Sequence, residues 1–417
     1  MEATILSRAG NIPNSNSMLL SLLVAALVAS DSIPTSVVES DLTAQGVALA
    51  VHHQPAVPLV ALRLSLMASD PAGYAGAGHL YQHIVHATLT ERAAKIGARV
   101  LIERSADAVV FTVTGSSLEL PYMAAMLRDA LSPNNVGEVQ LLRVSRELAE
   151  ERLAEWETAE RHVRSVLRLR LFPNDISAAG TEPSAARLAD RNGWRTAWTR
   201  MYRPDRVSIT AVGDVSLDQV RAAFGTLPPP FETPSAPQFR DTVSTVPLAP
   251  AEATRAWIGV GHLADDVDPT VLSVATRILN DRLRQQLPNA GVTAEHWWTH
   301  HGQAVALVAS VPGPQLAAAQ RTLNASIAAA ASAVTAAQVS AASNGIRRDL
   351  LFFSRTPDRM AGVIGQFSDR TGNPDEAQIF FDRLSSVTLA EVRAALTSLQ
   401  GGTTARIEIP PQRLIRR

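Results

Sequence analysis

Apolar and polar residues alternate through residues 45–69 (QGVALAVHHQPAVPLVALRLSLMAS), which is the two-residue period of β-strands. This stretch predicts two paired strands, and a helix is expected to follow from Gly78 to Ala94. Residues 98–114 (ARVLIERSADAVVFTVT) then predict a strand hairpin. Two helical segments are expected next, at 118–131 and at 136–171, and the second is long and rich in Glu, Arg, Leu and Ala.

A strand at 207–213 (VSITAVG) and a helix at 217–224 close this half, and the second half repeats the layout. Its expected elements are a strand at 256–261, a helix at 268–287, a strand at 303–311, helices at 315–333, 336–353 and 387–399, and a last strand at 405–409. Thr388 is the expected cap of the last helix.

A proline-rich stretch, LPPPFETPSAPQ at 227–238, separates the two halves and predicts a semi-rigid connector. The pattern therefore predicts an α+β protein of two domains, at residues 40–227 and 251–417, joined by a linker at 228–250. The length of 417 residues agrees, because it exceeds what one ordinary core needs.

The composition of the chain excludes several classes of function. Hydrophobic residues make up 46% of the chain and charged residues 18%, which allows a large core. The formal charge of −1 gives no general attraction to nucleic acid or to anionic membranes, and no basic stripe interleaved with aromatic residues supports nucleic-acid binding. The chain has no cysteine, which excludes disulfides, thiolate zinc sites and cysteine nucleophiles. Any bound metal must be held by His, Asp or Glu.

The amino terminus carries an apolar run of twelve residues, MLLSLLVAALVA at 18–29, which is too short for a comfortable membrane span. Small residues follow it, so residues 1–30 predict a signal segment and an exported protein, periplasmic or secreted, that is not integral to the membrane after cleavage. A buried terminal helix and a mitochondrial presequence are the alternatives, and the second lacks the usual arginine-rich amphipathic pattern.

Three histidines, His79, His83 and His86, lie four and then three residues apart, which places them on one face of the predicted helix. Two histidines one turn apart can both direct a ring nitrogen at one zinc ion, and a carboxylate from elsewhere would complete a site with an open position for water. The acidic helix at 136–171 offers several glutamates. On spacing alone, the same pattern fits a solvated or half-buried histidine stripe.

The segment from Gly76 to His83, GAGHLYQH, resembles the inverted zinc motif H-x-x-E-H of the pitrilysin–insulinase family of zinc peptidases. Further segments resemble family elements in the same order: the hairpin GARVLIERSADAVVFTV (97–113), the distal-glutamate segment VSRELAEERLAEWE (144–157), the Tyr-x-Pro, strand and Val-Gly-Asp signature MYRPDRVSITAVGDVSLDQV (201–220), the helix RILNDRLRQQL (277–287) and the closing helix SVTLAEVRAAL (386–396). The resemblance covers nearly the whole chain from about residue 45.

This resemblance implies two homologous α/β-sandwich domains, each an antiparallel-rich sheet with helices, arranged as a clamshell. It is similar to the arrangement in mitochondrial processing peptidase and in the core subunits of complex III. It also implies zinc held by His79, His83 and Glu151. Glu150 is the alternate for the third ligand, and His86 is a second alternate.

The family's general base corresponds to Gln82 here. A glutamate at this position would take a proton from zinc-bound water, whereas an amide has no site of useful basicity near neutral pH. The resemblance implies a substrate-gripping Arg and Tyr in the second half, but near their expected places stand Pro288 and, a few residues on, Ala294. Because both halves depart from the peptidase pattern, natural loss of catalysis is favoured over an engineered substitution at Gln82.

The expected function is therefore a non-catalytic, pseudo-peptidase subunit that binds peptides or scaffolds a homologous partner in a homo- or heterodimer. The alternative is an active zinc endopeptidase that cleaves extended peptides with a base supplied by Glu91, Glu150 or another carboxylate. His300 and His301 beside Trp297 and Trp298 suggest a second metal site or, as we prefer, an aromatic segment packed in the second domain. His52 and His53 are expected at the surface.

Overall fold

The protein is represented by a computed structural model that describes residues 38–68, 70–104, 107–132, 136–172, 182–230, 254–300, 302–402 and 404–411. The predicted signal segment at 1–30 and nearly all of the predicted linker at 228–250 lie outside these ranges, so the domain boundaries remain predictions. Among the described residues, no single helix has the length and apolar composition of a membrane span. One pair of helices, Gly313–Ala333 and Ala336–Phe353, meets both criteria together but is bent by 111°.

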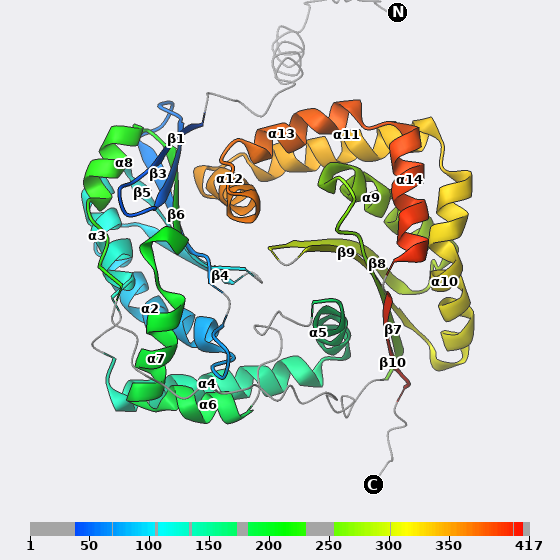
Figure 1. Cartoon of the computed structure of the whole chain (residues 1–417), viewed down its shortest axis with the longest axis horizontal. Coiled ribbons are helices and arrows are strands. Elements are labelled where there is room, and N and C mark those ends of the chain that lie inside the picture. The colour runs from blue at the N-terminus through cyan, green and yellow to red at the C-terminus, as the bar shows by residue number, and fades with distance from the viewer. Residues whose placement is uncertain are drawn as a thin grey trace, which may run out of the picture. The chain divides into compact units, whose positions relative to one another are not determined.

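The first half forms a sheet that we call sheet A (Figure 1). Its strands are β1 (Glu39–Leu42), β2 (Ala48–His53), β3 (Leu59–Leu66), β4 (Arg99–Arg104), β5 (Val109–Ser116) and β6 (Val207–Gly213). Their order is β1-β2-β6-β3-β5-β4, and only β2 and β6 pair in parallel. The predicted β4–β5 hairpin is confirmed. By contrast, β2 and β3 do not pair with each other, because β6 lies between them.

The second half forms sheet B, whose strands are β7 (Ala256–Leu263), β8 (Gly291–Thr299), β9 (Gly302–Val311) and β10 (Thr404–Ile409). Their order is β10-β7-β9-β8, all antiparallel, which repeats the order β6-β3-β5-β4 of sheet A. The predicted α+β fold with two similar sandwich halves is therefore confirmed by topology.

Helices make up the other layers of each half. In the first half they are α2 (Ala77–Ala94), α3 (Leu120–Ala130), α4 (Glu138–Glu157), α5 (Ala159–Leu171), α6 (Glu182–Ala189), α7 (Arg191–Met201) and α8 (Leu217–Phe224). In the second half they are α9 (Pro269–Gln286), α10 (Leu316–Ala333), α11 (Ala336–Phe353), α12 (Pro357–Thr371), α13 (Glu376–Arg383) and α14 (Leu389–Gly401). Thr388 caps α14 in a capping box with Glu391, as predicted.

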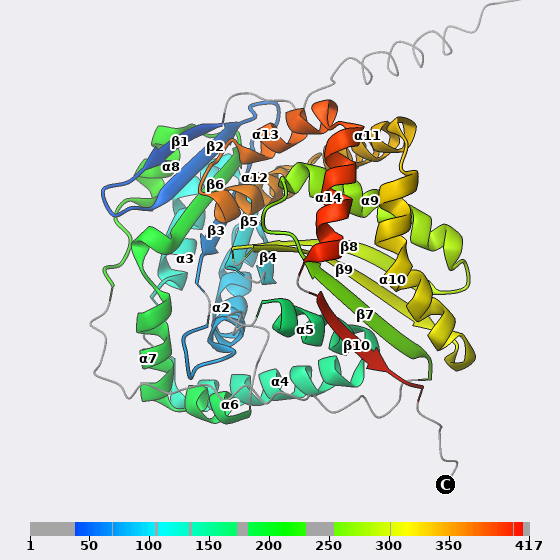
Figure 2. The ribbon, with the colours of Figure 1, turned by 45° about the vertical axis from the view of Figure 1, so that its right-hand side comes forward.

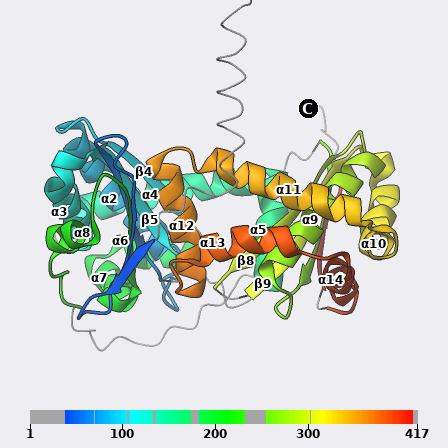
Figure 3. The same cartoon turned by 90° about the horizontal axis from the view of Figure 1, so that it is seen from above.

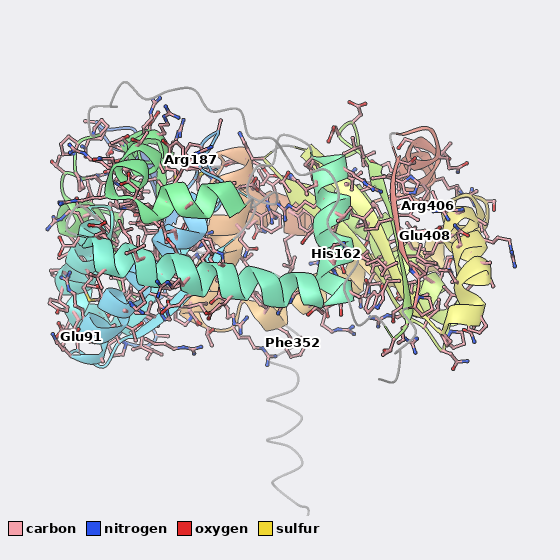
Figure 4. All side chains as sticks on the ribbon, turned by 90° about the horizontal axis from the view of Figure 1, so that it is seen from below. Glu91, His162, Arg187, Phe352, Arg406 and Glu408 are labelled. Atoms are coloured by element: carbon pink, nitrogen blue, oxygen red, sulfur yellow. The ribbon has the colours of Figure 1, made fainter. Side chains whose placement is uncertain are left out.

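The long helix expected at 136–171 is two helices, because Thr158 adopts an extended backbone (φ −89°, ψ 111°) between α4 and α5. After this break α5 leaves the first half and packs on sheet B against β7 and β10 (Figure 2). Its buried Val163, Leu167 and Leu171 form an apolar cluster with residues of β9 and β10. Figure 4 labels His162 on α5, and Arg406 and Glu408 on β10.

Two glycines of β7 let α5 approach the sheet closely. A Cβ atom added to Gly259 would lie 2.5 Å from Leu167 Cδ1, and one added to Gly261 would lie 2.5 Å from Leu171 Cδ1. Real Cβ atoms do not come this close to carbon atoms, so any larger residue would push the helix outward. The small size of these two residues therefore serves the contact between the halves.

In the opposite direction, α12 of the second half packs on β3 and β6 of sheet A (Figure 3). Its buried Asp369 accepts hydrogen bonds from three side chains of sheet A: Arg63 Nη2 at 2.7 Å, Ser65 Oγ at 2.6 Å and Ser208 Oγ at 2.5 Å. Arg63 is 2% exposed and Asp369 is 6% exposed. A buried carboxylate with three donors therefore ties the second half to the first.

The strand β8 was not predicted, and neither were β1, α6, α7, α12 and α13. A half-buried polar group explains part of the difficulty in β8. The ring of His296 lies 2.9 Å from Ser273 Oγ and 3.1 Å from Gln303 Oε1, so a neutral ring with its proton on Nε2 satisfies both contacts. Burial lowers the pKa of His296 to about 4, and nearby Arg370 also favours the neutral ring.

Substituting Asp369 by Ala should strongly destabilise the protein, because it leaves the guanidinium of Arg63 buried without a counter-charge. Losing one partner of a buried ion pair typically costs about 3–5 kcal/mol. Urea unfolding followed by far-UV circular dichroism measures this change. Asp266→Asn, at an exposed position, is the control and should leave the midpoint unchanged. An Asp369→Ala midpoint equal to that of the control would show that the carboxylate does not hold the halves together.

The lowered pKa of His296 makes stability pH-dependent. The ordinary pKa is 6.5 and the folded one about 4, so the unfolded chain takes up a proton that the folded chain refuses as pH falls. The associated stability is present above pH 6.5 and is lost between pH 6.5 and 4. This loss amounts to about 2 kcal/mol between pH 7 and pH 5. Between these two pH values, the free energy of unfolding of His296→Gln should fall by that much less than the free energy of unfolding of the unmodified protein. Urea unfolding at the two pH values measures the difference. Burial also lowers the pKa values of His162 and His262, but these histidines are present in both proteins and so do not affect the comparison. Equal pH dependence in the two proteins would contradict the assignment.

Candidate metal centre

The candidate site begins with the first turn of α2. Gly76 precedes the helix in a left-handed conformation (φ 90°), which favours glycine. The buried carboxylate of Asp70 accepts hydrogen bonds from Gly76 N at 2.6 Å and from Gly78 N at 2.7 Å. A carboxylate on the free N–H groups of a helix start is favourable by both hydrogen bonding and the helix dipole. Asp70 therefore fixes where α2 begins, nearly two turns before His83.

The buried face of α2 fixes the rotation of the helix. Tyr81 packs edge-on against Phe111, with ring centroids 5.3 Å apart, and lies 4.5 Å from the ring of Trp198. Its hydroxyl donates to Ala130 O at 3.1 Å, and burial raises its pKa well above the ordinary value. With Tyr81 locked into the core, the side chains of His79 and His83 lie on the face that meets α4.

There the two imidazoles meet the carboxylate of Glu151 on α4. Glu151 Oε2 lies 3.2 Å from His79 Nε2 and 3.2 Å from His83 Nε2, and the two Nε2 atoms are 3.2 Å apart. The histidines are 17% and 21% exposed, and Glu151 is 50% exposed. Three donor atoms therefore form a triangle with equal sides that is reached from solvent.

The triangle has the dimensions of a zinc site. Zinc–ligand bonds of about 2.0–2.1 Å in a tetrahedron place neighbouring ligand atoms roughly 3.3 Å apart. Two imidazole nitrogens and one carboxylate oxygen are also ligand types that zinc accepts, with a fourth position left open. The donor set and its geometry thus fit the zinc that the sequence resemblance implies.

The alternate ligands named from the sequence lie outside this triangle. Glu150 and His86 are both exposed, and neither belongs to the His79–His83–Glu151 group, the one such group found among the described residues. Glu150 precedes Glu151 by one residue, which turns its side chain by about 100° around α4. The structure brings Glu151, rather than Glu150, to the histidines. Their roles as metal ligands remain predictions.

Gln82 is half-buried beside His83, and its side chain makes no hydrogen bond to any described residue. Its amide can donate or accept a hydrogen bond, but it does not take a proton near neutral pH. Pro288 lies in the turn between α9 and β8, and Ala294 lies within β8, so neither position offers a side chain that can hold a peptide backbone.

Two further histidine pairs can now be placed. His52 is 2% exposed within β2, so its expected surface position is wrong: four consecutive residues, 49–52, are buried, which means that both faces of the strand are covered there. His53 is exposed, as expected. Trp298 packs edge-on against Phe367, with centroids 5.6 Å apart, which agrees with the preferred aromatic packing. His301 lies outside the described residues.

Sequence reasoning missed Asp70, although a short polar residue a few positions before a Gly-rich helix start is a recognisable capping signal. It also missed Arg164 of α5, which donates to Glu295 from both Nε and Nη2, the shorter bond being 2.6 Å, and pairs with Glu160. These hydrogen bonds raise the pKa of Arg164 against the opposing effect of burial. A contact between residues so far apart in the chain leaves no local signal.

Neither a family profile nor a curated protein sequence matches the chain. Solved structures do match. A protease from Helicobacter pylori superposes with a TM-score of 0.72 at 13% identity, over 88% of this chain and 98% of that one. An inactive peptidase M16 domain from Pseudomonas fluorescens gives 0.70 at 13% identity, over 90% and 98%. A chain of complex III from Candida albicans gives 0.71 at 12% identity, over 90% and 96%. The protein therefore has the fold of the M16, or pitrilysin, peptidases and of their inactive relatives.

Proposed function

We propose that this chain binds zinc through His79, His83 and Glu151 and serves as a peptide-binding subunit that does not itself cleave peptides. The observation that carries the proposal is the triangle of donor atoms beside an amide: a ligand set of zinc dimensions, with Gln82 where a carboxylate base is required. Metal binding and catalysis are thereby separated, because Gln82 is not one of the three donors.

Bound zinc would polarise the carbonyl of a peptide bond placed at the open coordination position. The chain's own residues would then hold the peptide there. Gln82 can donate a hydrogen bond to a carbonyl oxygen or to a water, which favours binding. It cannot remove a proton from water or return one to a leaving amine, so both proton transfers of hydrolysis lack a carrier at this position.

The carboxylates considered as replacement bases are poorly placed. Glu91 lies twelve residues after His79, about 18 Å along α2, and pairs with Lys95 at 3.0 Å. Figure 4 labels it at the edge of the first half. Glu150 is exposed and does not belong to the triangle. Glu147, one turn before Glu151, pairs with Arg143 at 2.7 Å. These positions favour a non-catalytic role over an active endopeptidase.

The similar structures suggest how such a chain is used. They include an inactive M16 domain, a chain of complex III and PqqL, a periplasmic protease of Escherichia coli. This protein covers 48% of the whole PqqL chain, so it corresponds to about one half of that protease. We propose a homologous peptidase-like chain as the partner, in a homo- or heterodimer. Export to the periplasm or outside the cell agrees with the apolar run at 18–29, and a mitochondrial location is the alternative.

Zinc binding should require the three donors and no others. His79→Ala, His83→Ala and Glu151→Gln should each weaken zinc affinity by more than about 100-fold, since even residues behind a ligand are worth 10–100-fold. His86→Ala and Glu150→Gln are matched controls from the same helices and should bind normally. Isothermal titration with zinc measures this, with circular dichroism to confirm folding. Loss of binding in a control variant, with retention in Glu151→Gln, would move the site to the alternates.

Peptide hydrolysis should be absent from the zinc-loaded chain and should appear with Gln82→Glu. Restoring an acid–base group is worth about 10²–10⁴-fold. Cleavage of a quenched fluorescent peptide library reports the gain, and the double variant with His79→Ala controls for contaminating peptidases. Strong cleavage by the unmodified chain that a chelator abolishes would contradict the proposal and establish an active endopeptidase.

A further inference from the structure

A pocket of about 540 Å³ lies in the second half beside the start of α5. We call it the α5 pocket; its walls come from α5, the end of α9, the turn into β8, and the strands β7 and β9. Its volume falls within the range of ligand sites, about 300–1,000 Å³. No residue of the candidate metal centre lines it.

Helix α5 contacts β7 closely through Val163, Leu167 and Leu171, and the pocket lies beside this contact. Toward its C-terminus, Leu167 and Leu171 press on the glycines of β7. Toward its N-terminus the facing residues are small: Gly291 lies beside Ser310, where an added Cβ would be 2.9 Å from Ser310 Oγ. Arg255 fixes this end by donating to Asn289 O at 3.3 Å and Ser310 O at 2.9 Å. The space is therefore held open by ordered backbone.

One side of the pocket is apolar. The half-buried indole of Trp257 lines it together with Leu287, Val292 and Val308. Trp257 is held in the middle of sheet B, paired with Ser310 on β9 and with Ile409 on β10. A flat aromatic surface fixed in this way suits an aromatic or large aliphatic side chain.

The other side of the pocket carries charged side chains, and only one of them is not already paired with another described residue. Arg164 is occupied by Glu295 and Glu160, so this cluster is a closed ion network. Arg284, from the last turn of α9, is exposed and makes no hydrogen bond or ion pair with any described residue. A free guanidinium pairs best with a carboxylate, which its planar fork can bind through two hydrogen bonds.

An apolar side chain and a carboxylate belong to one residue only at the carboxyl terminus of a peptide. We infer that the α5 pocket binds the C-terminal residue of a peptide, with its apolar side chain on Trp257 and its free carboxylate on Arg284. The inference rests on the proposed peptide-binding function. The run from α4 into α5 connects the two sites: Glu160, on the pocket wall, follows Glu151 of the metal centre by nine residues.

The test compares free acids with amides on the full chain. Isothermal titration is run with N-acetylphenylalanine and its amide, and with a ten-residue peptide ending in phenylalanine in both forms. The acid of each pair should bind about tenfold more tightly than its amide, as expected for one charged hydrogen-bonded pair. Arg284→Gln should abolish the difference. Arg321→Gln, another exposed arginine without a described partner, is the matched control and should retain it.

The outcomes separate this inference from the function on which it rests. Equal binding of acid and amide, or equal loss in both arginine variants, overturns the α5 pocket while leaving peptide binding at the metal centre intact. Acid-selective binding of N-acetylphenylalanine without binding of either peptide overturns both, because the pocket would then take a small carboxylic acid and no peptide C-terminus. Absence of binding by all four ligands to folded protein overturns both.

Discussion

The exchange of one helix between the two halves is the constraint on which the rest of the structure depends. Each sheet buries one face against a helix that the chain supplies from the other half: α5 covers sheet B, and α12 covers sheet A. Apolar contacts and close-packed glycines hold the first contact, and the Asp369 carboxylate holds the second. Because removing either helix would expose a sheet face, the halves are expected to fold and unfold together.

The metal centre depends on this exchange through α4. His79 and His83 are placed by the core of the first half, through Tyr81 and the Asp70 cap. Glu151 is placed by α4, whose far end continues into α5 and is thereby anchored on sheet B. The third donor is therefore positioned by both halves, although all three donors belong to the first. A displacement of α5 would therefore move Glu151 more directly than either histidine.

Much of this arrangement could be predicted from the sequence, and what could not has a physical reason. The strands β6 and β9 are buried along nearly their whole length and rich in Val, Ile, Leu and Ala, and they were recognised nearly to the residue. The spacing of His79 and His83, with the resemblance at 144–157, also led to Glu151. The strand β8 was missed because its polar His296 is satisfied by Ser273 and Gln303, partners that only the fold brings close. The break at Thr158 was missed because threonine is only weakly disfavoured in helices, so a single threonine does not mark a break.

The short extended step at Thr158 also restricts how the chain can change length. A helical residue advances the face of a helix by about 100°. The stretch from 152 to 158 therefore sets a fixed angular phase between the carboxylate that meets the histidines and the apolar side of α5 that meets the β7 glycines. One inserted or deleted residue there would force a choice between the two contacts. Surface loops elsewhere can change length, whereas the number of residues in this segment is fixed by the contacts at its two ends.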